Sequence, residues 1–421
     1  MRLFAFLLLL AGPAAAEDLR ISAEDFIAVN EGQAALGRLL FYDPVLSGNR
    51  NISCGTCHHH DHGSSDGLSL GLGEGGHGLG PDRAVEAGAI SKRIPRNAPG
   101  LWNLGHRSIR VLFHDGRLEI SDLYGNGFDS PAEEYLPPGL ANIVAAQALF
   151  PLTAEFEMAG QASENDMAAS LRERIDMAWP LAAGRVAAIP AYRAAFADLD
   201  QPVTPVTIAN ALGAFIIAEW QSHDSPFDAW LEGTPLPEEA ERGRVLFFGE
   251  AACASCHSGP LFTDQEFHAL ALPAFGPGRT RRFDPIPRDT GRMAATDRIE
   301  DAYRFRTPSL RNVALTAPYG HNGAYPTLEG IIRHHVEAEP RWTPEMAKLP
   351  AAPGFETVDF AIRQDRLEMA RQAAVRDTRP LPLTDRDIAD LEAFLHALTG
   401  RTATDRPFGR PETVPSGLPV D

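Results

Sequence analysis

Positive charge is scarce in this chain of 421 residues, which has 38 Lys and Arg against 56 Asp and Glu. The formal net charge of -18 argues against nucleic acid and against anionic membrane surfaces as partners. Long apolar runs are also missing. After the first sixteen residues, no segment approaches the ~20 apolar residues that a transmembrane helix needs, so we expect no membrane span in the mature chain. A basic small protein would suit the acidic balance, but a solvated acidic surface explains it equally well.

The first sixteen residues have the pattern of a secretory signal peptide. Arg2 forms a short positive region, residues 3–10 are apolar, and Ala14 and Ala16 give a cleavage site of small residues before Glu17. An uncleaved membrane anchor is the alternative, but the apolar run is short for a bilayer. The sequence therefore predicts export of residues 17–421.

Cysteine is equally scarce, and its four copies form two C-x-x-C pairs, each followed at once by His. The motifs are Cys54, Cys57 and His58, then Cys253, Cys256 and His257. This is the attachment pattern of c-type haem, in which the thiols add to the vinyl groups and the His ligates the iron. A disulfide, a zinc site or a redox-active pair does not require a His at that place. We therefore expect two covalent haems and no disulfide.

The first motif continues into three further histidines, His59, His60 and His62. We interpret them as loop residues beside the haem edge rather than as a separate metal-binding tract.

A weak internal repeat precedes the two motifs. Gly-Arg-x-Leu-Phe occurs at Gly37 and again at Gly243. Repetition of this kind predicts two tandem cytochrome c domains, residues 17–230 and 231–400, joined within the Pro-rich segment 222–240. Residues 401–421 form a Pro-rich tail that we expect to be ordered only by docking.

Helix signals exceed strand signals along the chain, so the expected fold class is mainly α with long loops. Ser22 and Asp25 resemble a capping box that opens a helix towards Tyr42. Residues 237–248 predict a second helix. Thr384 and Asp387 start a third, with Ile388, Leu391, Leu395 and Leu398 on one face, which Gly400 ends. The Gly-rich segment 70–81 and the basic segment 279–292 predict loops.

Five stretches together identify a resemblance to the bacterial di-haem cytochrome c peroxidase and MauG superfamily. They are residues 36–58, residues 96–103 with 113–117 (RNAPGLWN and FHDGR), residues 146–160, residues 241–260 and residues 305–335. The resemblance covers about residues 35–400. It implies two cytochrome c domains with a calcium ion between them, a peroxide-reactive N-terminal haem and an electron-relaying C-terminal haem.

For the peroxide-reactive haem, the resemblance implies an acid–base carboxylate. Gln147, Pro151 and Glu157 keep the spacing of the family, so Glu157 is the expected acid–base group and Gln147 its polar neighbour. A carboxylate there can move a proton between the two peroxide oxygens. His77, in GHGLG, resembles the loop His that caps this iron in some resting peroxidases; an exposed loop His is the alternative.

The second haem departs from the family at its second axial ligand. Members place Met or Tyr at a position that falls here on His335, with His334, Met293 and Met346 as alternatives. Two imidazoles should give a lower haem potential than His with Met. The departure favours MauG-like oxidation of a protein over electron uptake from ordinary cytochromes.

A second departure concerns the segment between the haems. Members usually have Trp before Asp-Gly-Arg, whereas this chain has His114, followed by an insertion at residues 118–144. His relays electrons less readily than Trp, although Trp102 could substitute. His321 is expected near the edge of the second haem, in a structural role.

The resemblance also implies that the calcium site of the family is retained. Asn97 matches its side-chain ligand, and Thr316 and Pro318 match its backbone carbonyl ligands. Calcium accepts such oxygen ligands and also water.

These observations predict a periplasmic di-haem peroxidase that reduces hydrogen peroxide with electrons from a small c-type cytochrome or cupredoxin. The alternative is a MauG-like enzyme that oxidises a side chain of a partner protein. A non-catalytic electron carrier is disfavoured, because a carrier has no use for Glu157. A homodimer is compatible with the sequence.

Overall fold

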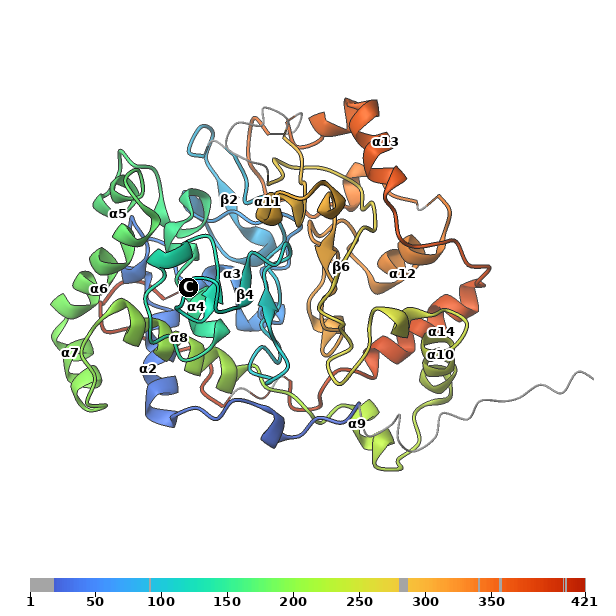
Figure 1. Cartoon of the computed structure of the whole chain (residues 1–421), viewed down its shortest axis with the longest axis horizontal. Coiled ribbons are helices and arrows are strands. Elements are labelled where there is room, and N and C mark those ends of the chain that lie inside the picture. The colour runs from blue at the N-terminus through green and yellow to red at the C-terminus, as the bar shows by residue number, and fades with distance from the viewer. Residues whose placement is uncertain are drawn as a thin grey trace, which may run out of the picture.

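The computed structural model describes residues 19–90, 92–279, 287–339, 341–355, 358–403, 405 and 407–420. Helices dominate and strands are short, as expected from the rarity of alternating patterns (Figure 1). The predicted signal peptide lies outside the described residues. Within these ranges, no helix has the length and apolar character that a membrane crossing requires.

The helices range from one turn to four turns. In chain order they are α2 (Glu31–Phe41), α3 (Cys54–Cys57), α4 (Ile143–Ala148), α5 (Asp166–Ser170), α6 (Ala178–Ala188), α7 (Pro190–Ala197), α8 (Pro205–Glu219), α9 (Pro226–Leu231), α10 (Glu238–Phe248), α11 (Met293–Thr296), α12 (Leu328–Val336), α13 (Arg366–Ala374) and α14 (Asp385–His396).

The strands form three small antiparallel sheets. β1 (Gly76–His77) pairs with β2 (Ala84–Val85), and β6 (Phe267–His268) pairs with β7 (Phe305–Arg306). β4 (Leu118–Ile120) lies between β3 (Val111–Leu112) and β5 (Phe128–Asp129). The predicted insertion 118–144 therefore begins by extending a hairpin of the first half.

Two crossed helix pairs organise the molecule, α2 with α8 in one half and α10 with α14 in the other (Figure 1). The repeated glycine lies at both crossings. A Cβ on Gly37 would lie 1.8 Å from the Ala211 carbonyl oxygen, and a Cβ on Gly243 would lie 1.8 Å from that of Asp390. The repeat therefore marks two equivalent positions where only glycine lets the helix backbones approach so closely.

Each half has its own apolar core. The first includes Phe41, Phe215 and Trp220, and the second includes Phe247, Phe262 and Phe394. In the second core, Phe227 of α9 already packs against Phe262 and Phe394, so the chain enters this half before residue 227.

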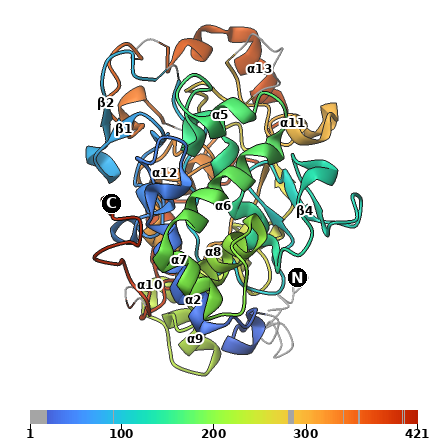
Figure 2. The same ribbon diagram turned by 90° about the vertical axis from the view of Figure 1, so that its left-hand side faces the viewer.

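Both chain ends cross to the opposite half. Leu19 packs against the second core, and its carbonyl accepts a hydrogen bond from Arg311 (3.1 Å). The C-terminal tail instead docks on the first half, beside α8 (Figures 1 and 2). There the buried Glu219 carboxylate accepts hydrogen bonds from the backbone N–H groups of Phe408 (2.9 Å) and Gly409 (3.0 Å).

Two of the three predicted helices are confirmed. α10 begins after Pro237, and α14 begins after Thr384 with the expected capping box and the expected buried face. The helix predicted from Ser22 towards Tyr42 is wrong in its first part. The capping box there opens a short 3-10 turn, Ala23–Asp25, after which Phe26 bridges to His106. The α-helix begins at Glu31, capped by Asn30.

Candidate haem sites

The first cysteine motif forms a single helical turn against the first core. Cys54 and Cys57 are free thiols at the ends of α3. Burial raises the pKa of each to about 12, and the charges of Asp66 and Glu157 add to the effect at Cys57. Gly55 is required between them, because a Cβ there would lie 2.3 Å from the Tyr42 ring. The thiols are therefore protonated and form no disulfide, and the turn between them packs against the Tyr42 ring.

His58 follows directly and is oriented by the backbone. Its Nδ1 donates to the Ser64 carbonyl oxygen at 2.9 Å, and the ring also bonds to the backbone of Pro99. Burial lowers the pKa of His58, so the imidazole is neutral, the form that ligates a metal. A backbone bond at the second ring nitrogen is how metal-binding histidines are usually oriented. Thiols and imidazole together fit a covalently attached haem.

Glu157 lies near this motif, on a π-helical turn, Glu155–Ala159. It raises the pKa of Cys57, which places its carboxyl group near the attachment thiols. Burial raises the pKa of Glu157 itself, while the positive charges of Arg117 and Arg279 oppose the rise. π-helical turns are rare and are often found at functional sites. A half-buried carboxyl group with a raised pKa has the properties of an acid–base group.

The Gly-rich loop holds this turn in place. A Cβ on Gly73 would lie 2.8 Å from the Glu157 Cα, and Glu74 N donates to the Glu157 carbonyl oxygen at 2.9 Å. Arg83 in turn ties the loop together by donating to the carbonyl groups of Leu72, Gly73, Gly76 and Gly78. The loop predicted at residues 70–81 is therefore held together by one buried guanidinium.

His77 lies in this loop on β1, with an exposed side chain. Its neighbours Gly75 and Gly78 both have positive φ, a backbone conformation that favours glycine. Ligation of the first haem by His77 stays a prediction.

Gln147 occupies the last turn of α4, and Pro151 starts the next helical turn, Pro151–Thr153. This turn packs against the one that carries Glu157. The three residues of the family spacing thus lie on three consecutive short helical segments. Gln147 is half-buried, and its role as the polar neighbour of Glu157 stays a prediction.

Asp66 is a buried carboxyl group that sequence reasoning missed. Burial raises its pKa to about 7, and its Oδ1 accepts a hydrogen bond from Leu68 N at 3.0 Å. In the sequence it follows two serines and precedes a glycine, a pattern that indicates only a turn. Its burial next to the first motif comes from tertiary packing.

The second motif brings His257 close to His335. Cys253, Cys256 and His257 follow α10, and His335 lies in the last turn of α12. Burial and then the charge of His335 lower the pKa of His257 to about 4. His257 Nδ1 bonds to the Phe262 carbonyl oxygen (3.1 Å), and His335 Nδ1 bonds to that of Ile331 (2.8 Å). The Nε2 atom of each imidazole is therefore left for another partner.

The alternatives to His335 have other roles. Both ring nitrogens of His334 are used, Nδ1 with the Tyr325 hydroxyl and Nε2 with the Leu270 carbonyl oxygen, each at 2.8 Å. Met346 packs against an apolar cluster around Leu70 and Tyr325, and Met293 begins α11.

His114 and His321 meet at Asn97, between the two halves. His114 Nε2 donates to the Asn97 carbonyl oxygen, and Asn97 N donates to that of His321, both at 3.0 Å. Burial lowers the pKa of His114 to about 4 and that of His321 to about 3. His321 also stacks on Phe305, with ring centroids 3.5 Å apart. Trp102 is buried nearer the first motif, where its Nε1 donates to the Gly63 carbonyl oxygen.

The three expected calcium ligands come from two adjacent loops. A Cβ on Gly100 would lie 2.7 Å from Thr316 Cγ2, so the loop of Asn97 lies against that of Thr316 and Pro318. Within the described part of the chain, the Asn97 Oδ1 and the carbonyl oxygens of Thr316 and Pro318 accept no hydrogen bond. Such unused oxygens fit a cation site.

Among the other histidines of the first motif, His60 has a defined structural role. Its Nδ1 contacts the Tyr42 hydroxyl and its Nε2 bonds to the buried Glu219 at 2.6 Å. His60 thus links the haem motif to the carboxylate that also holds the C-terminal tail.

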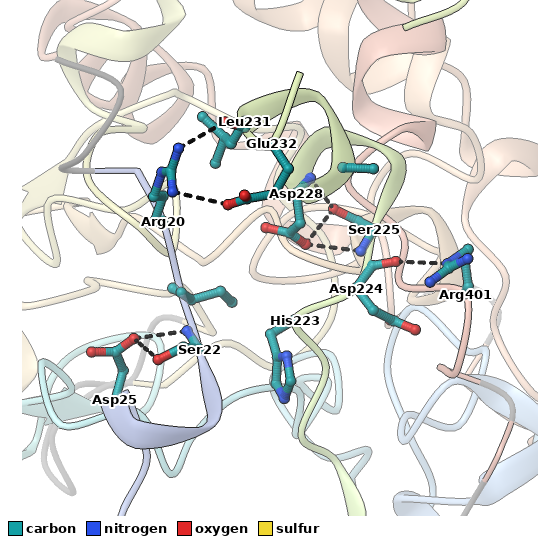
Figure 3. A pocket seen from close by; sticks show the side chains of 12 residues that line it. Arg20, Ser22, Asp25, His223, Asp224, Ser225, Asp228, Leu231, Glu232 and Arg401 are labelled. Atoms are coloured by element: carbon teal, nitrogen blue, oxygen red, sulfur yellow. Dashed lines mark hydrogen bonds and ion pairs between the residues drawn. The ribbon is translucent and has the colours of Figure 1, made fainter. Parts of the chain in front are cut away.

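Two further features carry no separate chemistry. Atoms of Cys256, Asp264 and His268 lie within 4.8 Å of one another, but Cys256 belongs to the second haem motif. An open cavity of about 470 Å³ lies between the N-terminal segment and residues 223–232 (Figure 3). Its charged groups are largely satisfied by one another, as in the Arg20–Glu232 pair at 2.9 Å.

Comparison with known proteins agrees with this geometry. A profile of the di-haem cytochrome c peroxidase family matches residues 31–235. The methylamine utilization protein MauG of Methylorubrum extorquens is 28% identical over 377 residues, which span 88% of this chain and 79% of that protein. The cytochrome c551 peroxidase of Pseudomonas aeruginosa is 29% identical, over 84% and 86% of the two chains. The chain belongs to the di-haem cytochrome c peroxidase and MauG superfamily.

Solved structures agree with this membership. A MauG-like protein associated with microbial copper homeostasis has a TM-score of 0.59 and 26% identity, over 93% of this chain and 96% of that one. The di-haem peroxidase BthA of Burkholderia thailandensis shares the fold, with a TM-score of 0.58 and 23% identity over 95% and 92% of the chains. This superfamily member is therefore an oxidoreductase of the cytochrome c peroxidase type, and its family implies two haems.

Proposed function

We propose that the chain is an exported, periplasmic enzyme that reduces hydrogen peroxide at a haem bound by Cys54, Cys57 and His58. Electrons are relayed through a second haem bound by Cys253, Cys256, His257 and His335. In this proposal each half is a cytochrome c domain, residues 17–230 and 231–400, with residues 401–421 as a tail. The observation that carries the proposal is Glu157, whose raised pKa and nearness to Cys57 suit proton transfer at the first haem.

Bound haem iron supplies the peroxide-binding position and the redox chemistry, and the protein supplies the proton transfers. The Glu157 carboxylate takes a proton from the incoming peroxide and returns it to the departing oxygen, which leaves as water. Gly73 packs against the backbone of Glu157, and Glu74 N bonds to its carbonyl oxygen. These contacts hold the turn in place, so the carboxyl group is oriented before peroxide arrives. Complete reduction to two waters consumes two electrons and two further protons.

The electron donor is proposed to be a small c-type cytochrome or a cupredoxin. An acidic chain with a net charge of -18 favours a basic partner. Asn97, Thr316 and Pro318 are proposed to bind calcium between the halves, where Asn97 also connects His114 with His321.

A second function, MauG-like oxidation of a side chain on a partner protein, is favoured by one observation. His335 lies near enough to His257 to lower its pKa, and a second imidazole should lower the potential of that haem relative to a Met ligand. Such a haem accepts electrons less readily from ordinary cytochromes.

Stoichiometric peroxide, added to the oxidised and to the half-reduced protein, tests the proposal. We expect the haem absorption spectrum to change within the mixing time, and a reduced c-type cytochrome to be consumed in turnover. A spectrum that changes without consumption of cytochrome selects the MauG-like function. No spectral change in either redox state would contradict both and leave an electron carrier.

A further inference from the structure

Arg306 is a guanidinium at the junction of the two halves that has no acidic partner among the described residues. It ends β7, and its backbone N donates to the His114 carbonyl oxygen at 2.8 Å. Its Nε donates to the Phe113 carbonyl oxygen and its Nη1 to that of Thr307, both at 3.2 Å. Within the described residues it forms no ion pair, and its hydrogen bonds to protein acceptors come from Nε and Nη1.

The arginines around it are arranged differently. Arg96 pairs with Asp115 and Asp289 at 2.8 Å, and Arg117 pairs with Asp115 at 2.9 Å. A cation removed from water is costly unless an anion and hydrogen-bond acceptors compensate it. Burial alone lowers the pKa of Arg306, to about 10, so it stays charged at neutral pH. Among the described residues, this half-buried cation has hydrogen-bond acceptors but no counter-charge.

Arg306 is connected to the segments around both cysteine motifs. The carbonyl oxygen of Thr307, the next residue, accepts a hydrogen bond from the Thr263 hydroxyl (2.6 Å). Thr263 lies on the segment that returns to the second haem motif, where Asp264 N donates to the Cys256 carbonyl oxygen (2.9 Å). In the other direction, Arg306 donates to the carbonyl oxygens of Phe113 and His114. Arg117, three residues after His114, lowers the pKa of Glu157 near the first motif. Arg306 therefore lies between the two haem-binding segments.

We propose that Arg306 binds a haem propionate and supplies its counter-charge. A propionate is a carboxylate, whose two oxygens match the parallel N–H groups of a guanidinium. The inference rests on the two-haem part of the proposed function and not on its peroxide chemistry. Either haem can supply the propionate, and the experiment distinguishes them.

The contact has a redox consequence. A fixed positive charge beside a haem stabilises the reduced form, which carries one more electron. Its removal should therefore lower the midpoint potential of the haem whose propionate it binds. The other haem should change much less, because the charge lies farther from it.

Spectroelectrochemical titration of the holoprotein at one pH tests this in the Arg306→Gln and Arg306→Lys variants. Arg298→Gln is the matched control, because it removes the same charge from an exposed arginine that pairs with Glu300. In Arg306→Gln we expect the one-electron equilibrium of one haem to shift at least tenfold towards the oxidised form, about 59 mV. Arg306→Lys should shift it less, and Arg298→Gln should leave both potentials unchanged.

The spectrum of the shifted haem identifies the source of the propionate. A shift at the low-spin haem assigns it to the second haem, and a shift at the other assigns it to the first. Unchanged potentials in Arg306→Gln, with two haems per chain retained, would overturn the inference, as would an equal shift in Arg298→Gln. Where Arg306→Gln does not retain both haems, the smaller shift expected in Arg306→Lys decides. Lysine keeps the charge but cannot form the paired hydrogen bonds that hold it against the carboxylate, so potentials equal to wild type would contradict the contact. Peroxide turnover is measured separately, so failure of the proposed function does not affect this result.

Discussion

His335 lies close enough to His257 for its charge to lower the pKa of the proximal imidazole, and each ring has its Nδ1 bonded to a backbone carbonyl. The two Nε2 atoms are thereby left available, as the proposed two-imidazole site requires. His334, the next residue along α12, has both nitrogens engaged and provides a natural control.

His335→Ala should convert the second haem from low-spin to high-spin, because it removes the sixth ligand while His257 remains. EPR of the oxidised protein measures this directly. His334→Ala should keep the low-spin signal and lower stability instead, since it removes two buried hydrogen bonds worth about 1–3 kcal/mol each. A low-spin signal that survives in His335→Ala would move the ligand elsewhere.

Glu157→Gln should slow the reaction with peroxide by about 10²- to 10⁴-fold, the usual contribution of a positioned acid–base group. Stopped-flow absorbance with excess peroxide gives the rate. Glu155→Gln is the matched control, because Glu155 begins the same turn but is exposed. Equal rates in the two variants would remove Glu157 from the mechanism.

The pH dependence of that step should follow from the raised pKa of Glu157. The carboxylate must be ionised to accept the first proton, so the rate should fall as pH decreases through a value above the ordinary ~4.3 of Glu. This acid limb should vanish in Glu157→Gln. Asp66, with a pKa of about 7, is the competing group. An acid limb lost in Asp66→Asn but kept in Glu157→Gln would reassign it.

Gly37→Ala and Gly243→Ala should each destabilise one half by at least about 1–3 kcal/mol, because the added methyl group meets helix backbone that cannot move aside. Urea unfolding followed by circular dichroism measures the loss. Gly184→Ala is the control. Gly184 lies exposed in α6 with nothing within 4 Å of its added Cβ, so alanine should stabilise by about 0.5–1 kcal/mol. Equal effects at all three sites would contradict the close crossings.

Removal of residues 407–421 should destabilise the first half, because the buried Glu219 carboxylate loses two backbone donors and Val414 leaves the core. The expected loss is about 1–3 kcal/mol for each unsatisfied hydrogen bond. Urea unfolding of the truncated chain measures it, with the exposed Thr413→Ala as the control. An unchanged unfolding midpoint would mean that the tail contributes nothing to stability.

Calcium should bind the chelator-treated protein, as measured by isothermal titration calorimetry. Asn97→Ala should weaken binding, because it removes a side-chain ligand. Thr316→Ala should bind nearly as well, because only the backbone carbonyl of Thr316 is proposed as a ligand. Weaker calcium binding by Thr316→Ala than by Asn97→Ala would contradict this ligand set.

Local patterns predicted what depends on neighbouring residues in the chain. Two C-x-x-C-H motifs, the helix from Pro237 and the capped helix from Thr384 are signals within a few residues, and the structure confirms both helices. The same kind of signal was wrong at Ser22. The capping box forms there, but pairing of Phe26 with His106 ends the helical turn. Such a contact joins residues 80 positions apart and leaves no local pattern.

The sequence by itself determined the family, the two C-x-x-C-H motifs, and the spacing that singles out Glu157 and His335, because these are matters of residue type and order. Tertiary structure decided which atoms remain available. Both ring nitrogens of His334 are bonded, whereas one nitrogen of His335 stays available. Asp66 is buried, the tail docks on Glu219, and Arg306 has no counter-charge among the described residues. Burial and hydrogen bonding depend on which distant segments pack together, and that arrangement exists only in the folded chain.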